Sequence, residues 1–352
     1  MALTQEQKAV LAASAKGRKA MQDLDAAILA DVRKQYDEAV RDIQQMIAVV
    51  AGAAGVVSIA ALPSLLLQIQ ARLGNLASAR NAALAQGIDR AATIGTTPFS
   101  STVNTGQLDY IRNDAVQFVK DFVGTDKLAL SDRLWRIDRH ANEIVNQAVQ
   151  NSVVRGEGAA QAARDFLARG MRPPAEIDLA KDAATARNIG NSVEEGLMTG
   201  RGAPLDNAMR VMRTEINRAH TKAYQQGAAA DDGSVGTQFM LSPRHPRVDI
   251  CDMHARANLF GLGAGVYPHG KSPLPAHPNT LSFEVIVYRD EVTEEDRAGK
   301  QSVTEFLDTV PSKDRKGILG ANKNEAFEAG QLPASQVKSR WRDVQRRIGR
   351  QS

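Results

Sequence analysis

The sequence predicts a mainly α protein, with a long helical N-terminal region, a small α+β domain containing a short β-sheet, and a helical C-terminal tail. Apolar residues recur every three or four positions through most of the first 200 residues, which is the pattern of amphipathic helices. A β-rich run, Phe283-Glu-Val-Ile-Val-Tyr288, predicts a strand, and short helical segments return from Glu295. The low aromatic content, 5%, and the abundance of Ala, Gln and Arg fit a helical protein.

Length and composition limit the classes of protein further. A chain of 352 residues is long enough for two or three domains, and we expect them at residues 1–200, 201–292 and 293–352, with a linker from Gly200 to Pro204. The net charge of +4 is mildly basic, which fits work near nucleic acid but is also common elsewhere. The single cysteine excludes an internal disulfide and favours a reducing compartment. The N-terminus shows no secretory signal pattern.

The N-terminal region is expected to begin with one long helix. From Tyr36 its apolar residues are spaced 4, 3, 4 and 3 apart, close to a heptad seam, and charged residues fill the other face. Gly95 to Gly106 is polar and is expected to be a loop. The apolar residues of the first helix are Met21, Leu24, Ile28, Val32, Tyr36, Val40, Ile43, Ile47 and Val50. Further helices are expected at 76–92, 107–122, about 25 residues from Leu130, 157–168 and 175–197.

The segment Met46 to Leu67 contains no charged residue. Its length reaches the lower limit of a membrane-spanning helix. However, Ala and Gly dominate it, an aromatic belt is missing, and Pro63 interrupts its end. We therefore favour a buried core or an oligomer contact, with membrane insertion as the alternative.

The α+β domain is expected to begin with a helix at 205–227. Strands are expected at 237–241 and 282–288, and between them lies a loop of about forty residues rich in Pro, Gly and His. Long loops in compact domains are usually functional or internally anchored. This loop is therefore the first place to look for a site.

Three segments in and before this loop form a recognisable series. They read Arg213-Thr-Glu215-x-x-Arg218, then Ser242-Pro-Arg-His-Pro-Arg-Val-Asp-Ile-Cys251-x-x-His254, then Pro273-x-Pro-Ala-His277-Pro-Asn279. Their order and spacing resemble the head-morphogenesis domain of tailed bacteriophages, the phage Mu F-like minor head proteins, over about residues 205–340. The family pattern has further cysteines, and here Thr280 and Ser282 stand in their places.

The resemblance implies a phage minor head protein that acts with the portal in head assembly and in DNA packaging or delivery. It implies a virion protein, assembled in the host cytoplasm, that is not an enzyme. Its implied partners are the portal protein, other head proteins and packaged DNA, with a homo-oligomer as a further expectation. One alternative is an ejected, membrane-active virion protein that uses residues 46–67. A less favoured alternative is a metal- or cysteine-dependent hydrolase.

Arg213, Glu215 and Arg218 are candidates for a structural clamp on the loop, together with His277 and Asn279. Residues two apart on a helix point apart, whereas Glu215 and Arg218, three apart, can pair. An enzymatic interpretation would make Glu215 a general base. The favoured interpretation is that Arg213 and Glu215 bond loop backbone groups that would otherwise be buried without partners.

Cys251, His254 and His277 are the candidate metal ligands, with Asp249, Asp252 or His269 as a fourth. The structural alternative is that His277 caps a turn and Cys251 is a small buried apolar group. Since the later cysteines of the family are missing, we expect no cofactor, with zinc as the alternative. No Gly-rich oxyanion turn flanks Cys251, and the chain has no Gly-Lys-Ser/Thr phosphate loop.

The C-terminal tail is basic and is a candidate for contact with DNA phosphates. An exposed helix end whose cations favour the helix dipole explains the same residues equally well. Only Trp341 lies among them, so base stacking is not indicated. The cations are Lys338, Arg340, Arg342, Arg346, Arg347 and Arg350.

Overall fold

The computed structural model describes residues 3–349 except 125, 244 and 279, and it confirms the predicted mainly α fold with one short sheet. By packing, the chain forms two units. Unit 1 is built from Met1–Asp23, Ile88–Val119 and Thr214–Ser352, and unit 2 from Leu24–Gly87 and Lys120–Arg213. Each unit therefore joins segments that are far apart in the sequence. The domain boundaries expected near residues 200 and 292 stay a prediction.

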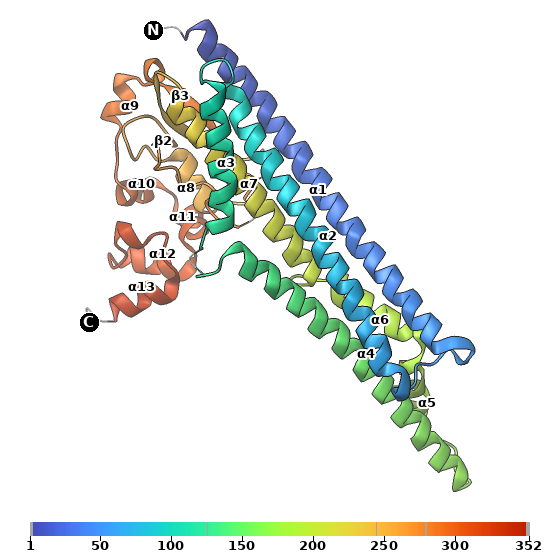
Figure 1. The fold of residues 1–352 in the computed structure, drawn as a ribbon. Helices are drawn as coiled ribbons and strands as arrows, with labels where there is room; N and C mark the ends of the chain where they lie inside the picture. Colours follow the sequence, from blue (N-terminus) through green and yellow to red (C-terminus); the bar gives the residue numbers. More distant parts are fainter. Residues whose placement is uncertain (1–2, 125, 244, 279, 350–352) are drawn as a thin grey trace. The chain divides into compact units, whose positions relative to one another are not determined.

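Unit 2 is entirely helical in its described elements. It contains the later part of α1 (Gln5–Ala51), most of α2 (Leu62–Thr96), α4 (Leu130–Ala168), α5 (Ala175–Lys181), α6 (Ala186–Met198) and the start of α7 (Pro204–Ala230). The expected heptad seam of α1 is confirmed, because Tyr36, Val40, Ile43 and Ile47 are all buried. Figure 1 shows α4 running beside α6, and α5 also packs on α4.

Helix α4 is longer than the sequence predicts, because the helix expected at 157–168 is its final part. Glycine in a helix interior normally costs about 1 kcal/mol relative to alanine, so Gly156 and Gly158 favoured a break. Gly156 instead permits a close approach, since a Cβ there would meet the Cβ of Ala184 at 2.4 Å. The gain in packing therefore keeps the helix continuous.

The uncharged segment Met46–Leu67 is the connection between α1 and α2. Helix α1 ends at Ala51, short 3-10 turns follow at Gly52–Ala54 and Ile59–Ala61, and α2 begins at Leu62. The segment is thus not one continuous helix. Among the helices described, none combines the length and the apolar character needed to span a bilayer.

The sheet of unit 1 has three antiparallel strands in the order β2-β1-β3. The central strand β1 (Ser234–Met240) pairs with β2 (Val266–Pro268) and with β3 (Phe283–Tyr288). Strands β1 and β3 match the predicted strands closely. Strand β2 has three residues, too few for an alternating pattern, and the sequence did not reveal it.

Helices cover this sheet within unit 1. Ile286 and Tyr288 of β3 pack in one buried cluster with Tyr224 of α7 and with Phe99. Helix α3 (Thr105–Asp121) packs against α7 through Ile111. Gly236 lies so close to β2 that a Cβ would meet the carbonyl oxygen of Tyr267 at 2.0 Å, so this position requires glycine.

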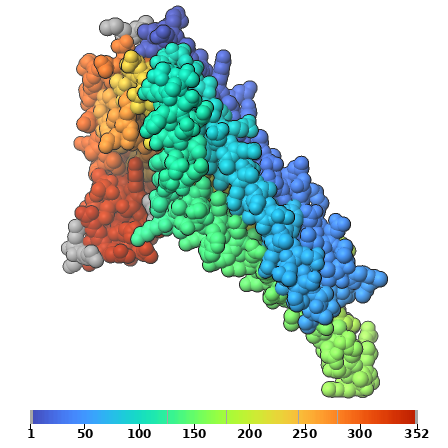
Figure 2. Space-filling view, in the orientation of Figure 1, coloured from blue at the N-terminus to red at the C-terminus, as the bar shows by residue number. Residues whose placement is uncertain are grey.

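The C-terminal helices form a compact part of unit 1, drawn in orange to red in Figure 2. They are α9 (Glu294–Ala298), α10 (Val303–Thr309), α11 (Ser312–Leu319), α12 (Ala321–Glu328) and α13 (Trp341–Ile348). Phe306, Leu319 and Val344 share a buried core with Met253 of α8 (Ile250–Arg256). The tail is therefore packed directly behind the helix that carries Cys251.

Candidate functional site

The loop between β1 and β3 is more regular than the sequence suggested, because it contains α8 and β2. Helix α8 starts with a reciprocal capping box. The Cys251 backbone N–H donates to Oδ1 of Asp249 at 2.7 Å, and the Asp249 N–H donates to Oδ2 of Asp252 at 2.9 Å. Both carboxylates named as candidate metal ligands thus have a structural role at the start of α8.

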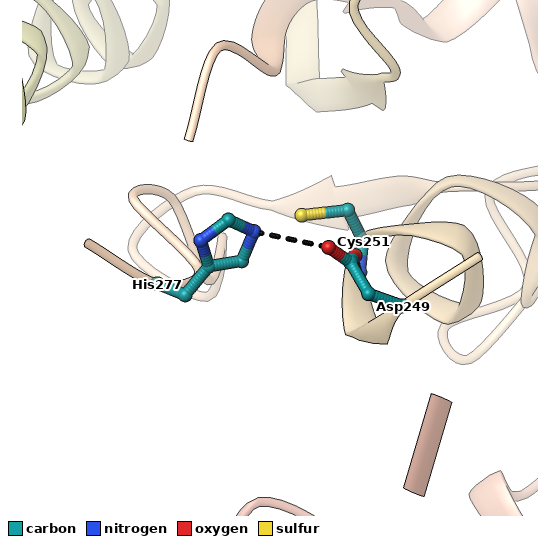
Figure 3. A group of neighbouring side chains, drawn as sticks. All are labelled: Asp249, Cys251 and His277. Atoms are coloured by element: carbon teal, nitrogen blue, oxygen red, sulfur yellow. Dashed lines mark hydrogen bonds and ion pairs between the residues drawn. The ribbon is translucent and has the colours of Figure 1, made fainter. Parts of the chain in front are cut away.

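Asp249, Cys251 and His277 converge (Figure 3). Their possible ligand atoms all lie within 4.8 Å of one another, and Nε2 of His277 is 3.4 Å from Oδ2 of Asp249. The Cys251 sulfur lies 3.8 Å from Oγ1 of Thr280. The expected closeness of His277 and Cys251 is therefore observed, and the loop is anchored there.

His254 does not belong to this group, which corrects the expected set of Cys251, His254 and His277. Its Nδ1 lies 2.8 Å from the Tyr267 hydroxyl, and its ring contacts Phe239 and Tyr267. Burial lowers the pKa of His254 to about 3, so it is a neutral partner inside the core. The third possible ligand beside Cys251 and His277 is thus Asp249, and not His254.

His245 forms a second group with the same carboxylates. Its Nε2 is 2.8 Å from Oδ2 of Asp252 and 3.8 Å from Oδ1 of Asp249, and Arg256 also pairs with Asp252. His245 was not among the predicted ligands, although its position four residues before Asp249 was a usable signal. His269, offered as a fourth ligand, instead faces the carbonyl oxygen of Ser234 at 3.2 Å.

The donors of the first group are a thiol, an imidazole and a carboxylate, which are the ligand types that zinc takes in proteins. One property of Cys251 opposes zinc binding at this group. Burial, followed by the charge of Asp249, raises the pKa of the Cys251 thiol to about 12. A metal would therefore have to displace the thiol proton, and at neutral pH Cys251 is a poor nucleophile.

The clamp expected at the Arg213–Arg218 turn of α7 stays a prediction, because Asn279 lies outside the described residues. Nε of Arg213 lies 3.1 Å from both carboxylate oxygens of Asp25 in α1, within unit 2. Glu215 is 2% exposed and pairs with Arg218 at 2.8 Å, as their three-residue spacing predicted. A contact from this turn to the loop is made by Asn217, whose Nδ2 donates to the carbonyl oxygen of Thr280 at 3.2 Å.

Sequence reasoning missed Asn217, because nothing in its spacing distinguishes it from other polar residues on α7. The other expected clamp residues are placed as follows. His277 lies at the Asp249–Cys251 group, and Asn279 lies outside the described residues.

The basic tail presents its cations on the outer face of α13. Val344 is buried in the C-terminal core, and Trp341 and Ile348 pack partly against it. The cations on α13 and just before it are exposed, and among the described residues none of them takes part in an ion pair. The exposed cations are Lys338, Arg340, Arg342, Arg346 and Arg347, while Arg350 lies outside the described part of the chain.

Unit 2 carries an apolar end around the α1–α2 connection. Val57 N–H bonds the carbonyl oxygen of Ala184 at 3.0 Å, and Ile59 N–H bonds Oε2 of Glu157 at 2.8 Å, so α4 and the α5–α6 junction lie against this connection. No charged residue occurs between Asp42 and Arg72. Exposed apolar side chains of this end are Val49, Val56, Ile59, Leu67, Val154, Leu167, Met171 and Leu179.

Comparison with known proteins gives no further assignment. No family model matches the chain, and neither a curated protein nor a solved structure matches it significantly.

Proposed function

We propose that this chain is a minor head protein of a tailed bacteriophage, acting with the portal in head assembly and in DNA packaging or delivery. In this proposal the protein is a non-enzymatic component of the virion and assembles in the host cytoplasm. Its partners are the portal, other head proteins and packaged DNA, and a homo-oligomer is compatible with the apolar end of unit 2.

The observation that carries the proposal is the contact between two of the three motif segments. Asn217, in the Arg-Thr-Glu helix, donates a hydrogen bond to Thr280, which directly follows the His-Pro-Asn segment. His277 of that segment in turn lies beside Asp249 and Cys251 of the middle segment. Residues of three segments that are separated by tens of residues thus lie close together in unit 1, which supports a shared family origin better than chance similarity does.

The chemistry of the site supports a non-enzymatic role. A nucleophilic cysteine needs a lowered pKa, whereas that of Cys251 is raised to about 12. Glu215, the candidate general base, is buried in an ion pair with Arg218. Both groups are therefore arranged to hold the fold together.

DNA contact is supported by the exposed cations of the C-terminal tail. Arg346 and Arg347 are exposed on α13, whose Val344 is buried in the C-terminal core. Such a surface meets phosphates without reading bases, which suits a protein close to packaged DNA of any sequence.

The portal association is tested by tagging the chain in the phage genome and separating head particles on a density gradient. We expect the tagged protein to sediment with particles that contain the portal and to be captured with the portal, identified by its mass. A tagged soluble host protein serves as the control. If the protein stayed in the soluble fraction throughout infection, the proposal would fail.

Membrane contact is the second candidate function, and the apolar end of unit 2 favours it. Val49 and Leu67 are 73% and 68% exposed on a segment without charge, a surface that can lie in the bilayer interface without crossing it. Flotation with liposomes tests this function. Val49→Asp combined with Leu67→Asp should abolish flotation, while Val123→Asp, at another exposed apolar position, should not. Absence of flotation by the unmodified protein would reject it.

A further inference from the structure

Glu284 of β3 is a carboxyl group inside the core of unit 1. It is 8% exposed, and its neighbours two and four residues on, Ile286 and Tyr288, are buried on the same face of the strand. Its cross-strand partner Phe239 belongs to a second buried cluster. Burying a carboxylate in such surroundings is costly unless a cation or several hydrogen bonds compensate.

The hydrogen bonds that the Glu284 side chain accepts all go to one of its two carboxyl oxygens, Oε1. Oε1 accepts from the Ser272 hydroxyl in the loop and from Nε2 of Gln225 in α7, the latter at 3.1 Å. Thr237 of β1 is a further neighbour that lowers the pKa of the carboxyl group. Oε2 is buried and has no partner among the described residues. The side chain therefore ties the loop to α7 and the sheet, and its second oxygen is free to carry a proton.

The groups that face Glu284 supply no compensating cation. From α7 and β2 these are Tyr224 and Tyr267, whose hydroxyl pKa values are raised mainly by burial and further by Glu284. From α1, Arg18 stacks over the Phe283 ring at 4.5 Å. No described ion pair includes Glu284. The neutral carboxyl group is thus the form that suits this environment.

We propose that Glu284 is a proton-operated latch: protonated, it holds residues 269–278 on α7 and the sheet, and ionised, it releases them and separates His277 from Cys251. The latch is independent of the head-protein proposal, because it follows from the contacts of Glu284 alone.

The direction of the pH dependence follows from linkage. Burial raises the pKa of Glu284 from 4.5 to about 7, only partly offset by the hydrogen bonds from Ser272, Gln225 and Thr237. The docked state therefore binds the proton more tightly than the released state. The stabilisation of the docked loop is fully present below pH 4.5 and is lost as the pH rises to about 7. Near neutral pH the loop is thus close to the point of release.

Hydrogen exchange of residues 269–278 tests the latch in the full-length protein. Protection factors are compared at about pH 5.5 and pH 8.5, because these values lie on either side of the expected titration. The unmodified protein should lose protection by about tenfold or more at the higher pH. Glu284→Gln keeps the hydrogen-bonding shape without ionising, and it should stay protected at both. Glu325→Gln, at an exposed glutamate of α12, should behave like the unmodified protein.

Two results would overturn the latch. One is an unmodified protein with equal protection of residues 269–278 at both pH values. The other is a folded Glu284→Gln variant that loses protection as the unmodified protein does. Should Glu284→Gln fail to fold, Ser272→Ala removes the loop's donor and leaves the carboxyl group in place. It should lower the protection of residues 269–278 at acid pH while β3 stays protected, and unchanged protection of the loop would also overturn the latch.

Discussion

Asn217 and Thr280 are joined by a hydrogen bond of 3.2 Å, from the side chain of α7 to the backbone of the loop before β3. Thr280 is buried, and its hydroxyl faces Cys251 at 3.8 Å. Asn217 of α7 therefore positions Thr280, which lies beside the Asp249–Cys251–His277 group. Helix α7 and the loop before β3 are joined at this point.

Replacement of Asn217 by alanine should lower the free energy of unfolding by about 1–2 kcal/mol, because the buried carbonyl oxygen of Thr280 would lose its donor. Chemical denaturation measures the change. Asn322→Ala, at an exposed position of α12, is the matched control and should have little effect. Equal stability of the two variants would contradict the assigned role of Asn217.

Glu215→Ala should destabilise the protein by about 1–3 kcal/mol, since Arg218 would be left partly buried without its carboxylate. Arg213→Ala should cost less, because Arg213 and Asp25 are both partly exposed to water. Thermal melts compare the two variants. Unchanged melting together with lost head assembly would instead assign these residues to a partner interface.

The purified chain should contain well under one zinc ion per molecule. The cluster has one thiol, held as its protonated form, and its carboxylate already serves α8 and His277. Elemental analysis after purification without chelators gives the ratio, and Cys251→Ser provides the background. One tightly held zinc per chain that disappears in Cys251→Ser would overturn this expectation.

The thiol of Cys251 should react slowly with iodoacetamide in the folded protein at about pH 8, because its pKa is raised to about 12 and the side chain is buried. In denaturant it should react at the rate of an ordinary cysteine. The chain has one cysteine, so the labelled fraction reports this site alone. A fast native reaction with an apparent pKa below about 8.5 would indicate an activated thiol.

Charge reversal on α13, as Arg346→Glu with Arg347→Glu, should weaken binding to double-stranded DNA of any sequence. If each cation contacts a phosphate, the slope of log affinity against log salt should fall by about 1 per residue replaced. Fluorescence anisotropy over a salt series measures both quantities. Lys8→Glu, at an exposed lysine of α1, is the control. An unchanged slope would assign the basic face to the helix dipole alone.

Much of the helical architecture could be read from the sequence because periodicity reports burial directly. The seam from Tyr36 to Ile47 is buried as expected, and β1 and β3 lie where their patterns predicted. Features that depend on tertiary contacts could not be read in this way. The continuity of α4 through Gly156 depends on Ala184, almost thirty residues further along the chain.

At the candidate site, too, some features could be predicted from the sequence and others depend on tertiary contacts. The closeness of Cys251 and His277 follows from the need to anchor a long loop. The orientation of His254 could not be predicted, because it depends on a hydrogen bond to Tyr267 in a strand too short to recognise. Asn217 was missed for a similar reason: a bond to one backbone carbonyl oxygen leaves no periodic pattern in the sequence.

The carboxylate of Asp249 divides its two oxygens between a helix and a loop. Oδ1 receives the Cys251 amide at the start of α8, and Oδ2 faces His277. A cation that drew this carboxylate away would have to compete with the first turn of α8, where a helix cap is worth about 0.5–2 kcal/mol. Helix α8 and a bound cation would therefore compete for the carboxylate of Asp249. Binding of a cation by the cluster would be detected as fraying of residues 249–252.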